Sequence, residues 1–308
     1  MKKVYFHKKE KYPWQKPKLK EEDPKALALV EKIMNSPTYK LAQEDWEFIN
    51  SDEARAIRLQ LDYLKPEIQM RKYGIKYTIV VFGSSRIRER KTAMKKLKTI
   101  QRELDKNPDS KELLRELDIA KRMLKKSVYY EDARHFGRLV GKSGKGPHDC
   151  KVTVMTGGGP GIMEAANRGA YDVGAKTIGL NISLPHEQYP NPYITPDLCF
   201  LFHYFAIRKL HFLNRAKALV IYPGGFGTLD ELFETLTLIQ TQKNQAIPVV
   251  MIDKSYWSRA IDFDFLKEEG VISGEDLDIF TFAKNAVEAW EYILEWYKKR
   301  DIELFNHF

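Results

Sequence analysis

Cysteine is scarce in this sequence, and the few cysteines present form no recognisable pattern. The chain of 308 residues contains two, Cys150 and Cys199, without a CxxC spacing, and its seven histidines show no HExxH pattern. We therefore predict no metal site. We also do not expect the two cysteines to form a disulfide, because thiols in a reducing compartment stay reduced.

Long apolar runs are missing as well. No stretch reaches the roughly 20 apolar residues that a membrane-spanning helix needs. The lysine-rich start, MKKVYFHKKEKYPW, is not followed by the apolar segment of a signal peptide. With 43% hydrophobic and 30% charged residues, the composition is that of an ordinary globular protein. We expect a cytoplasmic protein with no membrane partner.

The excess of positive charge is confined to one segment. Residues 86–127 hold 15 Lys or Arg against 7 Asp or Glu, which is +8 of the chain's net charge of +9. Apolar residues at helical spacing on both sides of the turn DKNPDS predict a helical hairpin inserted at about 88–127, ahead of a separate helix at 129–142. The cations of the hairpin are most simply a solvated face, with a nucleic-acid or partner contact as the alternative. Because the segment has no Phe, Tyr or Trp to stack on bases, we do not expect nucleic acid as a partner.

Apolar runs that alternate with helical patterns predict the core of the fold. Runs that are apolar on both faces suit parallel strands covered by helices on each side. Strand and helix in alternation are typical of an α/β protein with an open, mostly parallel sheet flanked by helices. The predicted strands lie at 77–85, 151–161, 175–182, 216–225 and 247–253.

The N-terminal quarter of the chain does not share this alternation. Residues up to about 22 have no periodicity and suggest an extended arm, and Asp23-Pro24 is a typical helix start. A further helix is expected after Ser51, and Pro66 should kink or end it. We predict two parts: residues 1–76, an arm and helices that pack on the core, and residues 77–308, the α/β domain with its inserted hairpin.

Three of the predicted strands end in loops of small residues. In an open parallel sheet, ligands bind outside the carboxyl ends of the strands. Glycine lets backbone N–H groups approach an anion, and the helix that follows adds unpaired N–H groups and the positive end of its dipole. Three such loops at one edge favour an anionic ligand, although none is a Walker A motif or a GxGxxG motif. The loops are Gly83-Ser84-Ser85, Gly157-Gly158-Gly159-Pro160-Gly161 and Gly224-Gly225-Phe226-Gly227-Thr228.

Charged residues near the third loop suggest chemistry as well as binding. Asp230 and Glu231 open the helix after this loop, where the helix dipole favours negative charge. A carboxylate close to a bound phosphate is unfavourable unless it acts elsewhere on the ligand, on a ribose hydroxyl, a water or a developing cation. Upstream, Arg208 can bind phosphate or ribose oxygens bidentately, although a lone arginine is more often a surface charge.

These motifs resemble those of a known family. PGGFGTLDE (223–231) resembles the PGGxGTxxE signature of the LOG family, the cytokinin-activating nucleoside 5′-monophosphate phosphoribohydrolases, some of which are also called lysine decarboxylase-like. TGGGPGIMEAANRGA (156–170), GLNISLPHEQYPNPYI (179–194) and the pair Arg208-Lys209 are similar to the larger bacterial branch. The resemblance covers residues 77–297 apart from the hairpin.

The resemblance implies a modified Rossmann fold that hydrolyses the N-glycosidic bond of a nucleotide. It assigns catalysis to Arg208 and Glu231. It places the 5′-phosphate at the third loop, and the other two loops complete the pocket. Glu164 is either a ribose contact or simply an acid at the start of a helix. The residues implied in substrate binding are Gly83, Ser84, Ser85, Gly157, Gly158, Gly159, Gly161, Glu164, Lys209, Gly224, Gly225, Gly227 and Thr228.

The resemblance also implies a substrate and an assembly. This chain has GGGPGIME where plant-type cytokinin activation is associated with GGGSxGLMG, so an AMP-like nucleoside 5′-monophosphate is the expected substrate. No cofactor is expected, because decarboxylation would need pyridoxal phosphate on a lysine and the glycine loops contain none. Family members assemble as dimers or larger homo-oligomers. The alternative function is a carrier or sensor of a nucleotide or a molybdopterin-like cofactor on the same fold.

Overall fold

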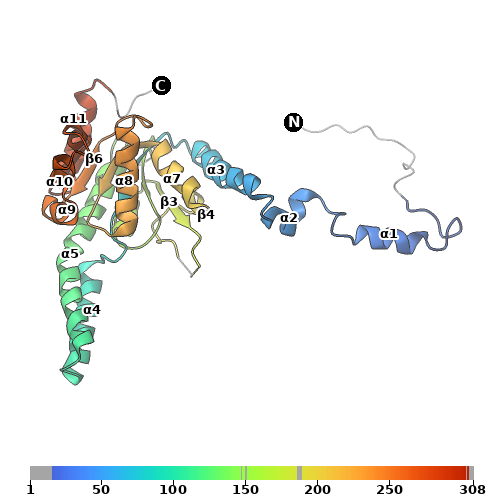
Figure 1. Cartoon of the computed structure of the whole chain (residues 1–308), viewed down its shortest axis with the longest axis horizontal. Helices are drawn as coiled ribbons and strands as arrows, with labels where there is room; N and C mark the ends of the chain where they lie inside the picture. The colour runs from blue at the N-terminus through green and yellow to red at the C-terminus, as the bar shows by residue number, and fades with distance from the viewer. Residues whose placement is uncertain (1–15, 147, 150, 186–188, 303, 305–308) are drawn as a thin grey trace. The chain divides into compact units, whose positions relative to one another are not determined.

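The computed structural model describes residues 16–146, 148–149, 151–185, 189–302 and 304 (Figure 1). The chain divides into two compact units, Met1–Arg58 and Leu59–Phe308. The boundary therefore falls inside a helix, eighteen residues before the division predicted at 76 and 77. The predicted packing of the N-terminal part on the core stays a prediction.

The N-terminal unit consists of short helices. Asp45 begins α2 by accepting a hydrogen bond from the backbone N–H of Phe48, at 3.2 Å. The first helix begins at Ala26, two residues later than the sequence suggested, although Asp23 still accepts from the N–H of Lys25 at 2.9 Å. The helices of this unit are α1 (Ala26–Met34), α2 (Trp46–Asn50) and the first turn of α3 (Arg55–Lys72).

A seven-stranded parallel sheet forms the centre of the second unit. Its strand order is β4-β3-β2-β1-β5-β6-β7, and every neighbouring pair is parallel. The predicted α/β class with an open parallel sheet is confirmed. The strands are β1 (Tyr77–Phe82), β2 (Val152–Thr156), β3 (Thr177–Ile182), β4 (Cys199–Phe202), β5 (Ala216–Ile221), β6 (Val249–Ile252) and β7 (Phe280–Ala283).

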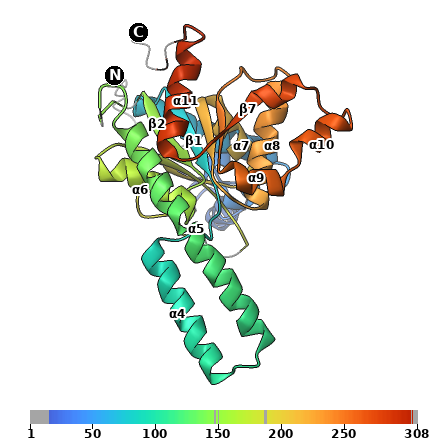
Figure 2. The same cartoon turned by 90° about the vertical axis from the view of Figure 1, so that its left-hand side faces the viewer.

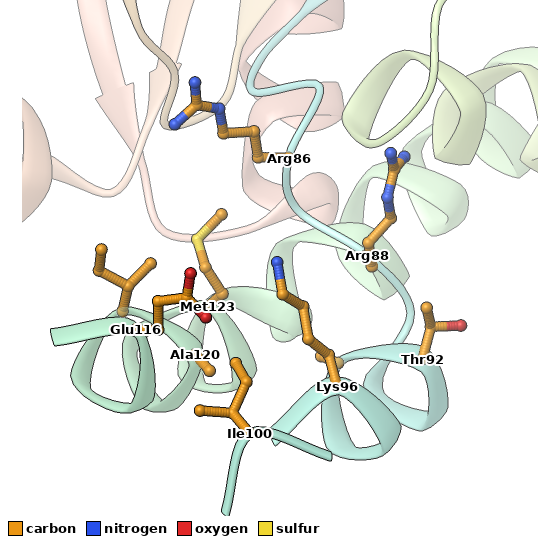
Figure 3. Close-up of a pocket in the computed structure, with 10 residues that line it drawn as sticks. Arg86, Arg88, Thr92, Lys96, Ile100, Glu116, Ala120 and Met123 are labelled. Atoms are coloured by element: carbon orange, nitrogen blue, oxygen red, sulfur yellow. The ribbon is translucent and has the colours of Figure 1, made fainter. Parts of the chain in front are cut away.

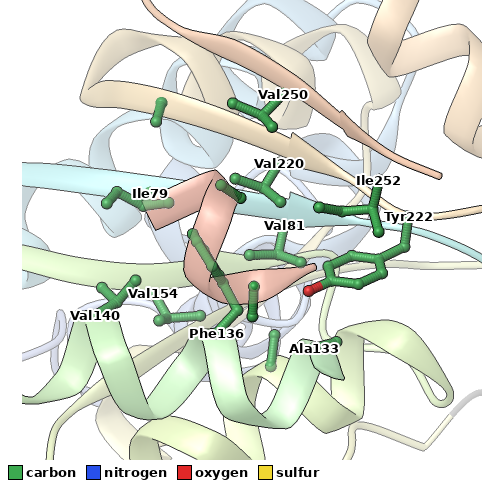
Figure 4. Packing of buried hydrophobic residues seen from close by; sticks show 14 of the residues in the cluster. Ile79, Val81, Ala133, Phe136, Val140, Val154, Val220, Tyr222, Val250 and Ile252 are labelled. Carbon is green, nitrogen blue, oxygen red and sulfur yellow. The ribbon is translucent and has the colours of Figure 1, made fainter. Parts of the chain in front are cut away.

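Helices cover both faces of the sheet. On one face, Phe136 and Val140 of α5 pack against Val81 and Val154 of the strands, as Figure 4 shows, together with residues of α6 and α11. On the other face, side chains of α3, α7, α8 and α9 pack against the strands. The helices that follow β1 are α4 (Arg90–Lys106), α5 (Lys111–Gly141), α6 (Ile162–Asp172), α7 (Phe205–Asn214), α8 (Phe226–Gln240), α9 (Lys254–Ala260), α10 (Phe263–Glu268) and α11 (Ala286–Lys298).

The sequence missed the two edge strands, β4 and β7. Each has four residues, CFLF and FTFA. Apolar runs this short fit a strand or a helix equally well, so only pairing with β3 and β6 decides their conformation.

The predicted hairpin is present, but the prediction of a separate helix at 129–142 was wrong. Helix α5 continues without a break from Lys111 to Gly141, so the second arm of the hairpin is also a core helix (Figure 2). No Gly or Pro interrupts the chain between Ser110 and Phe136. Ser127, where we placed the boundary, bonds its hydroxyl to the carbonyl of Leu124 within the helix, at 2.7 Å.

Pro66 does not end α3, so that part of the prediction was wrong, whereas the alternative, a kink at Pro66, stays a prediction. The helix runs from Arg55 to Lys72 with Pro66 inside it. Proline removes one helical hydrogen bond, whose usual acceptor is the carbonyl of Asp62. Asp62 anchors the helix by another route, because its carboxylate accepts from the backbone N–H groups of His203 and Tyr204, both at 2.9 Å. Packing of α3 therefore overrides the local cost.

Candidate active site

The three glycine and serine loops lie side by side at the carboxyl edge of the sheet. They follow β2, β1 and β5, which are consecutive in the strand order. The chain reverses its direction of winding between β1 and β5, the kind of position where open α/β sheets bind ligands. Backbone bonds join the loops: Ser84 N–H donates to the carbonyl of Pro223 at 3.0 Å, and its carbonyl accepts from Ile162 N–H at 3.2 Å.

A cavity of about 540 Å³ opens at this edge. It brings together most residues of the first and third loops and both residues predicted to be catalytic. The predicted site residues that line it are Gly83, Ser84, Ser85, Arg208, Gly225, Gly227, Thr228 and Glu231.

Glu231 is almost completely buried in the wall of this cavity. It lies in the second turn of α8, and only 5% of it is exposed to solvent. Burial raises the pKa of its carboxyl from 4.5 to about 7, although the positive charges of Lys209 and Arg208 act in the opposite direction. A carboxyl with such a pKa exchanges its proton near neutral pH, as a general acid or base must.

Arg208 of α7 is held in a fixed position beside the glycine loop. Its Nε donates to the carbonyl of Leu180 at 2.7 Å, and its guanidinium lies over the ring of Phe212, 4.9 Å from the centroid. Burial lowers its pKa, and the negative charges of Glu231 and Asp230 oppose that shift. Gly157 makes room for it, because a Cβ there would lie 2.6 Å from Nη2 of Arg208. Gly157 thus acts through Arg208 and not as part of the cavity wall.

The other residues of the Gly157–Gly161 loop support the site without lining the cavity. Gly158 has φ +71° and Gly161 has φ +77°, a region that residues with a side chain rarely adopt. A buried network braces the loop: Asn191 donates to the carbonyl of Gly159 at 3.1 Å and to Oδ1 of Asn167 at 2.9 Å. None of Gly157, Gly158, Gly159 and Gly161 lines the cavity.

The third loop is also supported from outside the cavity. Gly224 packs against the side chain of Thr228: a Cβ on residue 224 would lie 2.6 Å from the Cβ of Thr228. Gly224 itself does not line the cavity. The hydroxyl of Tyr256 donates to the carbonyl of Gly224 at 2.6 Å. Backbone N–H groups of Thr228 and Leu229 both donate to the carbonyl of Gly225, which caps α8, so Gly227 lies in the first turn of that helix.

Two further predicted substrate contacts also lie outside the cavity. Lys209 forms ion pairs with Asp230 at 2.8 Å and Glu234 at 2.9 Å on α8. Glu164 accepts from the hydroxyl of Tyr130 at 2.6 Å. The structure therefore does not bring either side chain to the cavity wall, and their assignment as substrate contacts stays a prediction.

The structure adds residues that the sequence reasoning did not single out. Arg86 lines the cavity as an additional cation, and Met163 and Phe226 supply apolar surface. Phe226 is 92% exposed. Arg86 directly follows the first loop, and Phe226 lies between two glycines of the third. Including the residues that flank or separate the small residues would therefore have identified both.

The described part of the chain carries neither a metal-binding cluster nor a membrane-spanning helix. Within these residues, no group of three or more His, Cys, Asp or Glu is arranged to hold a metal ion. No helix there combines the length and the apolar character needed to cross a bilayer. Cys199 is a free thiol. Cys150 lies outside the described residues, so the prediction that the two cysteines form no disulfide stays a prediction.

The fold and the cavity define an α/β protein with a pocket that carries charged side chains at the carboxyl edge of a parallel sheet. Residues 163–293 match the model of the family described as "Possible lysine decarboxylase". The chain is also similar to the probable cytokinin riboside 5′-monophosphate phosphoribohydrolase LOG4 of Oryza sativa subsp. japonica, with 30% identity over 138 residues. That match covers 44% of this chain and 59% of the rice protein, less than two thirds of its length.

Further relatives carry the same kind of name. Cytokinin riboside 5′-monophosphate phosphoribohydrolase LOG3 of Arabidopsis thaliana is 28% identical over 178 residues, covering 56% of this chain and 77% of the relative. The X-ray structure of TM1055, a Northeast Structural Genomics Consortium target, aligns with a TM-score of 0.41 at 18% identity, covering 71% of this chain and 99% of that chain. The family match and the named relatives confirm the resemblance to the LOG family.

Proposed function

We propose that this protein hydrolyses the N-glycosidic bond of a nucleoside 5′-monophosphate, with AMP as the first candidate substrate. The products are the free base and ribose 5-phosphate. The observation that carries the proposal is the buried carboxyl of Glu231, with a pKa of about 7, in one cavity with Arg208 and residues of the first and third loops. The names of the similar proteins support a reaction of this class.

The phosphate of the substrate is assigned to the third loop. Gly225, Gly227 and Thr228 line the cavity at the start of α8, where backbone N–H groups and the positive end of the helix dipole favour an anion. Ser84 and Ser85 supply hydroxyl groups from the neighbouring loop. Gly224 and the Gly157–Gly161 loop support this arrangement without lining it.

Glu231 is assigned to the bond that breaks. As the C1′–N bond lengthens, its electron pair goes to the base and positive charge develops on the ribose, as in other glycoside hydrolyses. An ionised carboxylate beside C1′ stabilises that charge and accepts a proton from the attacking water, whose oxygen forms the new bond to C1′. The departing base takes up a proton from solvent. Arg208, held by the Leu180 carbonyl, fixes the nucleotide and compensates the charge of Glu231.

The test is an activity screen with a matched pair of variants. We expect base and ribose 5-phosphate to be released from at least one of AMP, GMP, CMP and UMP. Chromatography measures the released base. Glu231→Gln should lower kcat by about 100-fold or more, since it removes the proposed base. Glu234→Gln is the control, because Glu234 lies one turn further along α8, pairs with Lys209 and does not line the cavity.

The pH dependence follows from the direction of the Glu231 shift. The raised pKa keeps the carboxyl protonated below about 7, so kcat should rise with pH through that value and the rise should disappear in Glu231→Gln. Release of no base from any of the four nucleotides, or full activity of Glu231→Gln, would refute the proposal. Tight nucleotide binding without turnover would favour the carrier or sensor function instead.

A further inference from the structure

A second cavity lies where the hairpin of α4 and α5 joins the core of the second unit (Figure 3). Its volume is about 500 Å³, within the range of pockets that hold small molecules and cofactors. Its walls come from the segment after β1, from α4 and from α5. The cavity therefore depends on the inserted hairpin.

The walls of this cavity combine apolar and cationic surface. Ile100 and Ala120, both at most 5% exposed, form an apolar floor between the two helices, together with Met123. Arg88 and Lys96 supply positive charge. In Figure 3 the Lys96 side chain extends from α4 toward the segment that carries the arginines, while Ile100 lies deeper between the helices.

The cations of the cavity are not neutralised by neighbouring acids. Among the described residues, Arg86, Arg88 and Lys96 form no ion pair within 4.0 Å. Of the described residues in the walls, only Glu116 carries a carboxylate. Glu89, next to Arg88 in sequence, instead pairs with Arg168 of α6. An anion placed here would meet a net positive wall.

The segment that presents the arginines is fixed on both sides. Ile87, between Arg86 and Arg88, is 1% exposed and packs in the core. Ser84 is bonded to Pro223 on one side, and Glu89 is paired with Arg168 on the other. A binding surface held in this way loses little conformational entropy when a ligand binds.

Arg86 connects this cavity to the candidate active site, because it lines both. In Figure 3 its guanidinium points away from the two hairpin helices, so its backbone and stem face the second cavity. A ligand in the second cavity would therefore contact a residue that also lines the candidate active site.

We propose that the cavity at the base of the hairpin is an effector site for a nucleotide with two or more phosphates. The phosphates contact Arg88 and Lys96, the hydroxyl of Thr92 lies within the same wall, and the base covers the apolar floor of Ile100, Ala120 and Met123. The effector role rests on the proposed function, whereas the binding site itself does not.

The binding site is tested by calorimetric titration of the full chain with ADP. The Arg88→Ala/Lys96→Ala double variant should lose one binding event or bind at least about tenfold more weakly, as expected for lost charge-assisted hydrogen bonds. Lys98→Ala is the matched control, because it removes a charge from α4 at a position that does not line this cavity. Equal ADP binding by wild type and double variant would overturn the site. So would equally tight binding of inorganic pyrophosphate, which would show that the apolar floor contributes nothing.

The effector role is tested on the cleavage of AMP. Without ADP, the double variant should cleave AMP as wild type does, since neither residue lines the candidate active site. Addition of ADP should change the KM for AMP in wild type and Lys98→Ala but not in the double variant. An unchanged KM in wild type with ADP bound would overturn the effector role. If no protein releases base at all, the proposed function fails, and the calorimetric comparison still decides the binding site.

Discussion

Glu231 shows how a single side chain can be placed at an energetic cost. An exposed glutamate loses its proton well below neutral pH, whereas burial keeps this one protonated up to about pH 7. Between these two values the unfolded chain binds fewer protons than the folded chain, so this residue lowers the stability of the fold as pH rises. A helix-start acid serving only the dipole would stay in water.

The stability of Glu231→Gln is therefore predicted to depend on pH. Gln keeps the shape of the protonated side chain and has no charge to desolvate. The gain in the free energy of unfolding over wild type should be about 2 kcal/mol larger at about pH 8 than at about pH 5. Urea unfolding at the two pH values measures this difference. A gain that is equal at both would mean that the Glu231 carboxyl is not perturbed by burial.

At the scale of the element, one ion pair joins α3 to the sheet. Glu67 of α3 is only 8% exposed. It accepts two hydrogen bonds from the guanidinium of Arg215, the residue immediately before β5, and one of these bonds is 2.8 Å long. These bonds lower the pKa of Glu67, and burial acts against them. The pair should therefore stabilise the fold above the ordinary glutamate pKa, and its contribution should be lost as pH falls through the lowered value.

Breaking this pair on one side should be worse than removing it. Arg215→Met leaves the buried carboxylate of Glu67 without its guanidinium partner, so the free energy of unfolding at neutral pH should fall by about 3 kcal/mol or more. The double variant Glu67→Leu/Arg215→Met should recover much of that loss, because no charge remains buried. Denaturant unfolding of wild type, the single variant and the double variant measures both values. A double variant less stable than the single one would contradict this account.

At the scale of the whole molecule, the sheet topology assembles the site and the surface suggests an assembly. The consecutive order of β2, β1 and β5 brings loops from distant parts of the sequence to one edge. Nearby, α7 and α8, linked by the Lys209 ion pairs, expose apolar side chains including Leu210 (50% exposed) and Phe233 (39%). Exposed apolar surface of this kind often marks a contact between proteins.

We predict that the chain forms at least a homodimer and that this apolar surface takes part in the contact. Phe233→Glu should convert the oligomer to a monomer, because it places a charge in an apolar interface. Val271→Glu is the control, since Val271 is also exposed, at 66%, but belongs to the turn after α10. Light scattering gives the mass of each protein in solution. A monomeric wild type, or an oligomer unaffected by Phe233→Glu, would contradict the prediction.

The sequence by itself determined the class of fold, the five inner strands and the three loops of small residues that follow strands. These features are local: apolar periodicity selects strands and helices, and glycine marks turns that other residues rarely form. Only the tertiary structure decided that α5 is one helix, that α3 continues through Pro66 and that four-residue runs join the sheet edges. Side-chain exposure is likewise a tertiary property, because it depends on residues distant in sequence. For that reason Glu231 and Arg208 could be named from their motifs. The packing of the whole core decided the rest: the burial of Glu231, the ion pairs of Lys209 with α8 and the two cavities that share Arg86.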